Sequence, residues 1–145
     1  MAVFVVWIGL ERSIYPSAGA GMPVALAGAT AGTRMAWISI RALAAATTVA
    51  VAEELAFRGF LLRRLMQEDF EAIPFGRFTW PALLVSSIAF GVLHGGRWIG
   101  GTVAGLLYGF AMIRRGRLGD AVIAHATTNA IVAVYVVGWS QWQLW

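Results

Sequence analysis

The sequence predicts an all-α protein, a polytopic bundle of at least four membrane-spanning helices. Hydrophobic residues make up 59% of the 145 residues, and the mean hydropathy is +0.73. Only 12% of the residues are charged, whereas about a quarter are charged in a typical soluble domain. Apolar stretches recur along the chain at lengths that suit spanning helices, and most charges lie at their ends.

The charge pattern indicates a membrane partner. The net charge of +4 comes from arginine, because the sequence has no lysine. Arginines at the ends of apolar stretches are typical of membrane topology and headgroup contact, and a nucleic-acid site would need a basic face with interleaved polar residues. We therefore expect a lipid bilayer and no nucleic acid as partner. The absence of cysteine excludes thiol catalysis, disulfides and thiolate metal sites.

Residues 1–34 form a poorly defined N-terminal segment. Residues 2–10 are apolar but would cover only about 14 Å as a helix, against a hydrocarbon core of about 30 Å. They either lie at the interface or end a longer helix that begins before this chain, and the lack of a basic region before them argues against a signal peptide. Residues 13–33 fit either a weak spanning helix packed through small residues or a loop outside the membrane.

A long helix is predicted over residues 35–66, which contain no glycine or proline before Gly59. It carries Glu53, Glu54 and Arg58. Glu54 and Arg58 are four residues apart and share one face, which favours an ion pair. Glu53 points about 100° away and has no partner four residues on. An ionisable residue at membrane depth costs about 2.5 to 3.5 kcal/mol, so one paired and one free carboxylate here indicate a function.

Four spans follow, at about residues 38–64, 79–96, 98–113 and 119–138, with a loop over residues 67–77. If consecutive spans alternate in direction, six arginines share one side, which the positive-inside rule makes cytoplasmic. Counting depth at about 1.5 Å per residue then brings the unusual polar residues to one layer of the membrane. The six arginines are Arg63, Arg64, Arg77, Arg114, Arg115 and Arg117, and the polar residues are Glu53, His94, His125 and Asn129.

Two further pairs are spaced for one helix face: Phe90 with His94, and His125 with Asn129. A partly desolvated carboxylate near an imidazole suits general-base activation of water. An imidazole and a carboxamide on one face suit an oxyanion site. Together they suit amide hydrolysis by water without a covalent intermediate. Taken singly, each histidine also fits an interhelical hydrogen bond, Glu54 with Arg58 fits a structural ion pair, and Phe90 fits a core or lipid contact.

The three motifs, in this order and one per helix, resemble those of the CAAX prenyl endopeptidase type II and bacteriocin-processing superfamily of intramembrane glutamic peptidases. The resemblance covers about residues 40–135 and implies a role for each motif residue. It implies that Glu53 and His94 activate water, that Glu54 and Arg58 support the site, and that His125 and Asn129 form the oxyanion hole. It also implies a mechanism without metal or other cofactor.

The resemblance extends to the cellular setting of the protein. The run from Phe78 to Ala130 is similar to a bacterial subgroup associated with exosortase-type protein sorting. We therefore expect a single peptidase domain over residues 1–145, a multi-pass location in the bacterial inner membrane, and a membrane-anchored protein or peptide as substrate. Family members usually have more spans, so the chain resembles a minimal or truncated version.

Two alternatives remain. The two glutamates, two histidines and asparagine are also a donor set for zinc, as in a membrane metalloprotease; however, the sequence has no H-E-x-x-H pair, and the adjacent glutamates diverge. The other alternative is a non-catalytic membrane scaffold or bacteriocin-immunity-type protein, in which the polar cluster serves helix packing. The sequence leaves the substrate's identity and the oligomeric state open.

Overall fold

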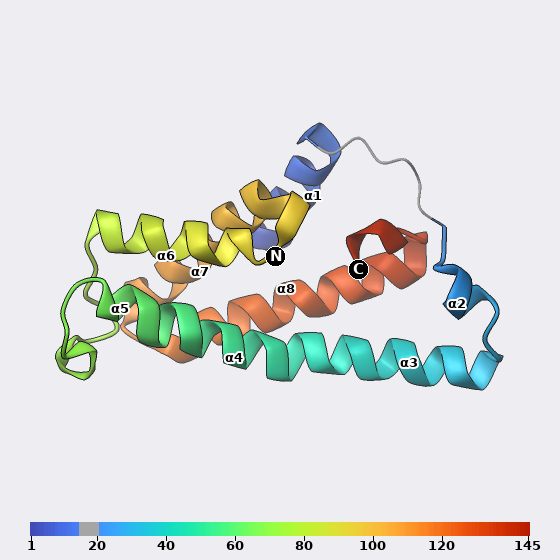
Figure 1. The fold of residues 1–145 in the computed structure, drawn as a ribbon, viewed down its shortest axis with the longest axis horizontal. Helices are drawn as coiled ribbons and strands as arrows, with labels where there is room; N and C mark the ends of the chain where they lie inside the picture. Colours follow the sequence, from blue (N-terminus) through green and yellow to red (C-terminus); the bar gives the residue numbers. More distant parts are fainter. Residues whose placement is uncertain (15–20) are drawn as a thin grey trace.

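The computed structural model describes residues 1–14 and 21–145, which form helices joined by turns and short loops (Figure 1). No strand occurs in this part of the chain, which confirms the predicted all-α class. The α-helices are α1 (Ala2–Ile14), α2 (Val24–Ala27), α3 (Ala31–Ala44), α4 (Ala50–Glu54), α5 (Leu62–Arg64), α6 (Trp80–Val92), α7 (Trp98–Arg115) and α8 (Leu118–Trp139). Short 3₁₀ turns are η3 (Phe70–Ala72), η4 (Gly95–Arg97) and η5 (Trp142–Leu144).

The predicted long helix is present and starts earlier than expected. α3, α4 and α5 follow one another through two π-helical segments and make one helix of 34 residues, Ala31–Arg64. It begins where it does because the Thr30 hydroxyl accepts a hydrogen bond from the backbone N–H of Thr33 at 3.2 Å. At about 1.5 Å per residue the helix is about 51 Å long, which exceeds the hydrocarbon thickness of a bilayer.

The two π-helical segments, η1 (Ala45–Val49) and η2 (Leu55–Leu61), were not predicted. They lie on either side of α4, the helical turn that carries Glu53 and Glu54. A π turn widens the helix and changes the direction of its side chains and carbonyls, and such turns are frequent at functional sites. The irregularity of the long helix is therefore concentrated around its acidic pair.

α6 and α7 form a hairpin in which the backbones approach closely. Glycines recur at every fourth residue of α7, at Gly101, Gly105 and Gly109. A Cβ at Gly101 would lie 2.8 Å from the Cα of Gly91 on α6, and a Cβ at Gly105 would lie 3.1 Å from the Cβ of Ser87. Small residues at this spacing are typical of packed membrane helices. Both helices were predicted from the sequence, whereas this glycine spacing was not part of the prediction.

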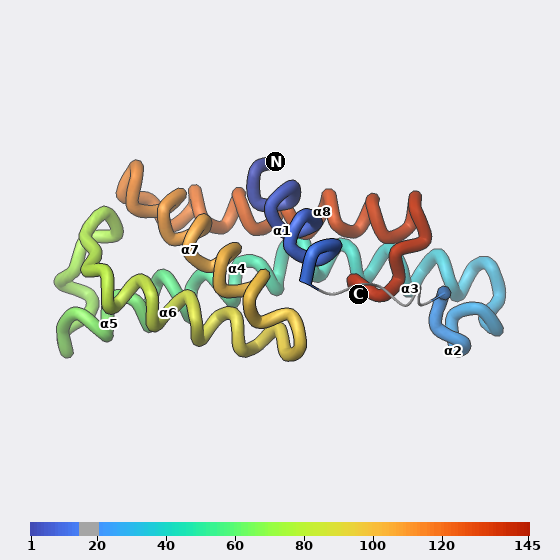
Figure 2. Tube along the Cα trace, turned by 90° about the horizontal axis from the view of Figure 1, so that it is seen from above, coloured from blue at the N-terminus to red at the C-terminus, as the bar shows by residue number. Residues whose placement is uncertain are grey.

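The N-terminal helix α1 packs across α7 and α8 (Figure 2). Phe4 contacts Tyr135 of α8 edge to face, with ring centroids 5.7 Å apart. Glu11 forms an ion pair with Arg97 at 2.8 Å. The helix runs on to Ile14, beyond the apolar stretch, and neither interpretation of residues 2–10 included these contacts with the bundle.

Residues 13–33 were predicted to be either a weak spanning helix or a loop. Residues 15–20 of this segment lie outside the described part of the chain. Within residues 21–30 the only helix is α2, four residues long. The described part of the segment therefore follows the loop interpretation, until the long helix begins at Ala31.

Two helices are long and apolar enough to cross a membrane, Ala31–Arg64 and Leu118–Trp139. α6 is apolar but has only 13 residues, or about 20 Å at 1.5 Å per residue. Many large apolar side chains are exposed along these helices, among them Ile40, Val85 and Val134. The helical membrane fold is thus supported, while the number of four spans stays a prediction.

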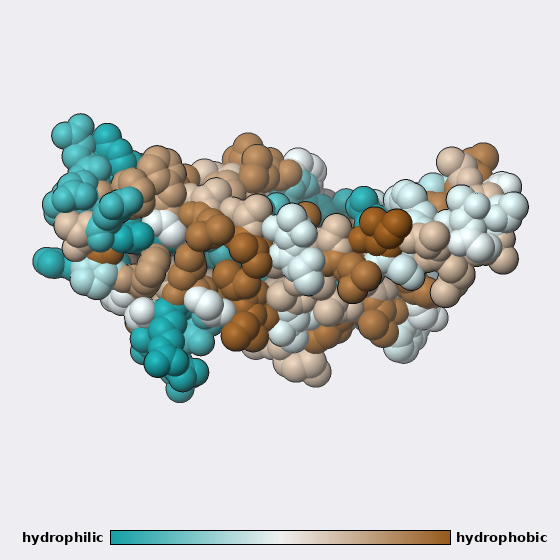
Figure 3. All heavy atoms as spheres, turned by 90° about the horizontal axis from the view of Figure 1, so that it is seen from below, coloured by the Kyte–Doolittle hydropathy of each residue, from teal (hydrophilic) through white to brown (hydrophobic). Residues whose placement is uncertain are grey.

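Hydrophilic side chains gather at one end of the molecule, over the loop before α6 and the turn before α8 (Figure 3). These connections touch, because a Cβ at Gly76 would lie 3.5 Å from the Cα of Gly116. Arg63 fastens the loop by donating to the carbonyls of Ile73 at 2.7 Å and Glu71 at 3.0 Å. The two connections therefore lie at the same end of the molecule, and their side of the membrane stays a prediction.

Candidate functional site

The ion pair predicted from the spacing of Glu54 and Arg58 is present and buried. The Arg58 guanidinium donates to Oε1 of Glu54 at 3.1 Å, and the side chains of Arg58 and Glu54 are 1% and 0% exposed. Arg58 also donates to the carbonyl oxygen of Gly105 at 2.7 Å and lies 4.3 Å from the ring centroid of Phe90. A buried pair is sustained only when further hydrogen bonds satisfy its charges, and Gly105 and Phe90 provide this support from α7 and α6.

His125 of α8 joins the two glutamates. Its Nδ1 lies 2.9 Å from Oε1 of Glu54, and its Nε2 lies 3.8 Å from Oε2 of Glu53. Because an ionised carboxylate only accepts hydrogen bonds, we assign the hydrogen on Nδ1 to the bond with Glu54. Nε2 therefore faces Glu53. The ring is stacked on Tyr108, with centroids 4.6 Å apart, so its orientation is fixed.

The two adjacent glutamates have different surroundings. Glu54 is fully buried and receives hydrogen bonds from both Arg58 and His125 on one oxygen. Its other oxygen, Oε2, is buried without a hydrogen-bond partner in the described part of the chain. Glu53 is 25% exposed and makes only the long contact with His125 among the described residues. Glu54 is thus a buried, hydrogen-bonded carboxylate, and Glu53 is an accessible one.

His94 and Asn129 lie beside this cluster but bond elsewhere. Nδ1 of His94 lies 2.9 Å from the carbonyl oxygen of Phe90, which only accepts, so Nδ1 carries the hydrogen and Nε2 has a free lone pair. Asn129 donates one amide hydrogen to the carbonyl of Ala45 at 2.8 Å. The structure records no hydrogen bond or ion pair between Glu53 and His94 in the residues that it describes. The histidine nearer to Glu53 is His125.

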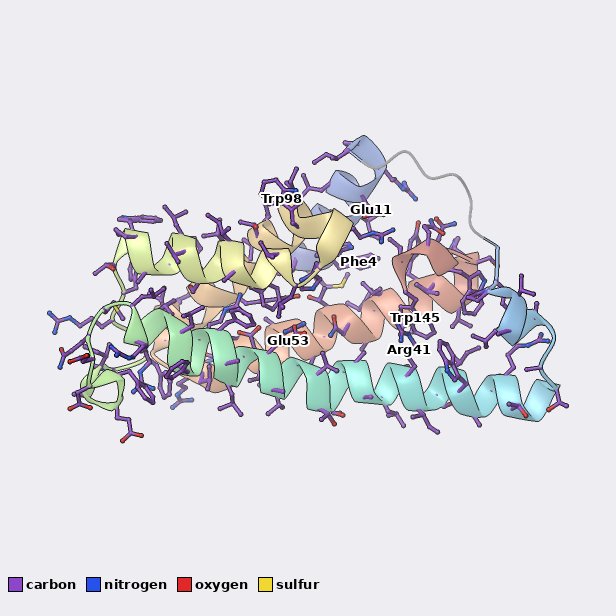
Figure 4. The ribbon with its side chains drawn as sticks, in the orientation of Figure 1. Phe4, Glu11, Arg41, Glu53, Trp98 and Trp145 are labelled. Atoms are coloured by element: carbon purple, nitrogen blue, oxygen red, sulfur yellow. The ribbon has the colours of Figure 1, made fainter. Side chains whose placement is uncertain are left out.

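A cavity of about 470 Å³ lies between the long helix, α8 and the C-terminal turn η5. His94, His125 and Asn129 all contribute to its wall, together with Tyr108. Figure 4 shows Glu53 on the side of the long helix that faces α8. The cavity gives a water molecule or a peptide segment room to reach His94, His125 and Asn129, whereas Glu53 is not among the residues that line it.

Three contributors to the site were missed or underestimated. The carbonyl of Gly105 is one, and only the glycine spacing on α7 could have pointed to it. Tyr108 is another; it lies seven residues after Gly101 on the same helix and carries no motif. Phe90 was interpreted as a core or lipid contact, and it does lie fully buried in the core, but it also packs against Arg58, His94 and His125.

Within residues 1–14 and 21–145, no group of three or more histidine, aspartate or glutamate side chains is arranged to hold a metal ion. Glu54 directs one oxygen to Arg58 and His125, and adjacent positions on a helix direct Glu53 and Glu54 about 100° apart. The contacts of the acidic pair are thus with an arginine and an imidazole.

Comparison with known proteins gives a family match. A family model described as type II CAAX prenyl endopeptidase Rce1-like matches residues 35–131. This range contains all three sequence motifs, from Glu53 to Asn129. The comparisons found no match among curated proteins and none among solved structures.

Proposed function

The chain belongs to the Rce1-like type II CAAX prenyl endopeptidases, a family of membrane-embedded proteases, and we propose that it is an intramembrane glutamic endopeptidase. It hydrolyses a peptide bond of a membrane-anchored protein or peptide with water as nucleophile, without metal or other cofactor. The observation that carries the proposal is that the two adjacent glutamates differ in burial and in hydrogen bonding. Glu54 is buried and bonded to Arg58 and His125, whereas Glu53 is accessible beside the imidazole.

Glu53 is the general base. It removes a proton from water while the water oxygen adds to the scissile carbonyl carbon, and the protonated Glu53 then gives that proton to the leaving amine as the C–N bond breaks. His94 orients the water, because its Nε2 lone pair is free to accept the second O–H. Glu53 and His94 make no direct hydrogen bond, and in this proposal the attacking water bridges them, as waters commonly do at active sites.

His125 and Asn129 bind the oxyanion of the tetrahedral intermediate. The carboxamide of Asn129 has two N–H groups, and the bond to Ala45 uses one of them, which leaves the other to donate. Since Nδ1 of His125 donates to Glu54, His125 offers a second N–H only when it is protonated on Nε2. Donors held in place before the reaction stabilise developing negative charge without reorganisation.

Glu54 and Arg58 are positioning residues. They fix the tautomer and orientation of His125 through Oε1 of Glu54, and the bond from Arg58 to Gly105 ties this arrangement to α7. Burial explains why a second carboxylate is needed. A lone buried arginine would be costly, and without Glu54 no described acceptor would hold the hydrogen on Nδ1 of His125.

The proposed orientation places the α5–α6 loop and the α7–α8 turn in the cytoplasm, with α6 and α7 crossing the membrane as a hairpin. The cluster of arginines at that end supports it. In a bacterial cell this would be the inner membrane. The scissile amide then lies inside the bilayer, so the substrate must be anchored there, by a lipid group or by a transmembrane segment.

The test is a co-expression assay in bacterial membranes. Two tagged reporters are used, one anchored by a prenylated cysteine and one by a single transmembrane segment, each with wild-type protein, Glu53→Gln or the control Glu68→Gln. Glu68 lies outside the site and is exposed. We expect cleavage by the wild type and the control, and none by Glu53→Gln at equal protein level. Processing by Glu53→Gln at the wild-type rate would contradict the proposal and favour the scaffold alternative.

A further inference from the structure

Trp7 of α1 lies against His94. The centroids of the indole and imidazole rings are 5.6 Å apart, and the rings meet edge to face at an angle of 62°. Both side chains contribute to the wall of the cavity. The indole also lies over α7, because a Cβ at Gly100 would be 3.5 Å from Cε3 of Trp7. Aromatic rings at this separation favour particular relative orientations, so Trp7 restricts the orientation of His94.

The imidazole of His94 is enclosed by three helices. Its Nδ1 lies 2.9 Å from the carbonyl oxygen of Phe90 on α6, and the Phe90 ring centroid is 4.8 Å from its own. The backbone of α7 bounds it as well, since a Cβ at Gly101 would lie 3.0 Å from Nδ1. One hydrogen bond through Nδ1 does not fix the plane of the ring. Trp7 adds the third contact, from α1.

A buried ion pair sets the position of α1. Glu11 lies four residues after Trp7, so the two side chains share one face of the helix, and Glu11 points toward the bundle (Figure 4). Nε of Arg97 lies 2.8 Å from Oε1 and 3.0 Å from Oε2 of Glu11, whose side chain is 9% exposed. Arg97 follows His94 by three residues. One face of α1 therefore contacts both ends of the short connection between α6 and α7.

The contact with Trp7 comes from outside the region that the family model matches. That region, residues 35–131, contains Phe90, His94 and Gly101, whereas α1 precedes it. Membership of the family therefore assigns no role to Trp7. In the proposed mechanism, Nε2 of His94 accepts a hydrogen bond from the attacking water. A group that holds the imidazole in one orientation and one tautomer therefore influences the chemical step.

We propose that Trp7 is a positioning residue for His94 and that the Glu11–Arg97 ion pair seats it, so that the N-terminal helix completes the catalytic site. The proposal rests on the proposed function, which gives His94 the task of orienting water. Trp7 acts through the imidazole and does not touch the reacting atoms. Its loss should therefore lower kcat and leave KM nearly unchanged, because an interaction needed in the transition state is weakened.

The first test observes His94 without turnover. The chain has only two histidines, so nitrogen-15 spectra of histidine-labelled protein, purified through a histidine-free tag, contain two sets of imidazole signals, which His94→Ala assigns. At about pH 8.5 an ordinary imidazole is neutral, and the spectra then distinguish its two tautomers. We expect the hydrogen of His94 on Nδ1 in wild type. Trp7→Ala should shift the His94 signals toward a mixture of tautomers and leave those of His125 in place.

Phe4→Ala is the matched control for both tests. Phe4 lies on the same helix and contacts Tyr135 edge to face at a centroid distance of 5.7 Å. Its loss removes a similar aromatic contact of α1 that does not involve His94. The His94 signals and kcat of Phe4→Ala should therefore match those of wild type, whatever the effect on the melting temperature.

The second test measures peptide cleavage. Trp7→Ala should lower kcat by about tenfold or more, since a misplaced catalytic group is costly even when the mutated residue is remote from the reaction. Trp7→Phe keeps an aromatic edge beside the imidazole and should restore most of kcat. Glu11→Gln removes the charge that seats α1, so it should change kcat and the His94 signals in the same direction as Trp7→Ala.

Unchanged His94 signals in Trp7→Ala would overturn the proposal. Equal losses of kcat in Trp7→Ala and Phe4→Ala would also overturn it, because they would mark a general stabilising role of α1, and a rise in KM alone would make Trp7 a wall for the substrate. If Trp7→Ala does not fold, Trp7→Phe and Trp7→Leu decide, since only the former should keep the wild-type signals. If Glu53→Gln cleaves as wild type does, the proposed function fails, while the spectra still decide whether Trp7 holds His94.

Discussion

Nδ1 of His125 and Oε1 of Glu54 lie 2.9 Å apart, and this contact joins α8 to the long helix inside the bundle. The same oxygen receives the bond from Arg58. One carboxylate therefore holds both a histidine and an arginine, and the neighbouring Glu53 is left accessible. We therefore expect Glu54 to position His125 and Arg58, and Glu53 to take part in the reaction.

Arg58→Ala should lower both stability and activity. It leaves Glu54 buried with a single donor and removes the link to Gly105, and breaking a buried pair costs about 3 to 5 kcal/mol. The measurement is thermal unfolding in detergent together with cleavage. Arg64→Ala is the matched control, because the ion pair of Arg64 with Glu68 is exposed and should be worth about 1 kcal/mol or less. Equal melting temperatures for Arg58→Ala and Arg64→Ala would contradict the assignment of Arg58 as a buried positioning residue.

Gly105→Ala should destabilise the α6–α7 hairpin and weaken the site. The added Cβ would lie 3.1 Å from the Arg58 guanidinium and from Ser87, and overpacking of this kind costs about 1 to 3 kcal/mol. Gly119→Ala is the control, since a Cβ there meets nothing within 4 Å and alanine favours a helix. The two melting temperatures should move in opposite directions. An unchanged melting temperature for Gly105→Ala would show that the close packing of α6 and α7 is not needed for stability.

The two histidines should differ in what they support. His125→Ala removes a donor from Glu54 and a ring stacked on Tyr108, so we expect loss of turnover together with a lower melting temperature. His94→Ala removes a half-buried ring whose one polar bond is to a backbone carbonyl, so turnover should fall with a smaller change in melting. Comparing unfolding with cleavage for both variants checks this. A larger stability loss for His94→Ala would reverse the assigned roles.

The topology can be tested directly because the sequence has no cysteine. Asp69→Cys lies in the loop before α6, and Gly96→Cys lies between α6 and α7, where a Cβ meets nothing within 4 Å. An impermeant thiol reagent should label Asp69→Cys only from the cytoplasmic side and Gly96→Cys only from the other side. Labelling of both from one side would mean that the α6–α7 hairpin does not cross as two spans.

The sequence predicted the helical class, the long helix and the Glu54–Arg58 pair because these depend on local spacing and hydrophobicity. The family was also confirmed, since its three motifs are short and ordered along the chain. The roles of Glu53, His94, His125 and Asn129 stay predictions.

Other features depend on contacts between distant segments, which local patterns do not encode. The bond of Asn129 to Ala45 and the nearer approach of His125 than of His94 to Glu53 are of this kind. The π-helical segments on either side of the acidic pair were not predicted either. The packing of α1 against α7 and α8 was missed for the same reason.

The most direct test of the central claim measures peptide cleavage by purified wild type, Glu53→Gln and the control Glu68→Gln, each with and without a strong zinc chelator, alongside their melting temperatures. The account predicts that wild type and control cleave with or without chelator, and that Glu53→Gln melts as wild type does but does not cleave. Loss of wild-type activity with the chelator would revive the metalloprotease alternative. Undiminished cleavage by Glu53→Gln would show that Glu53 is not the base.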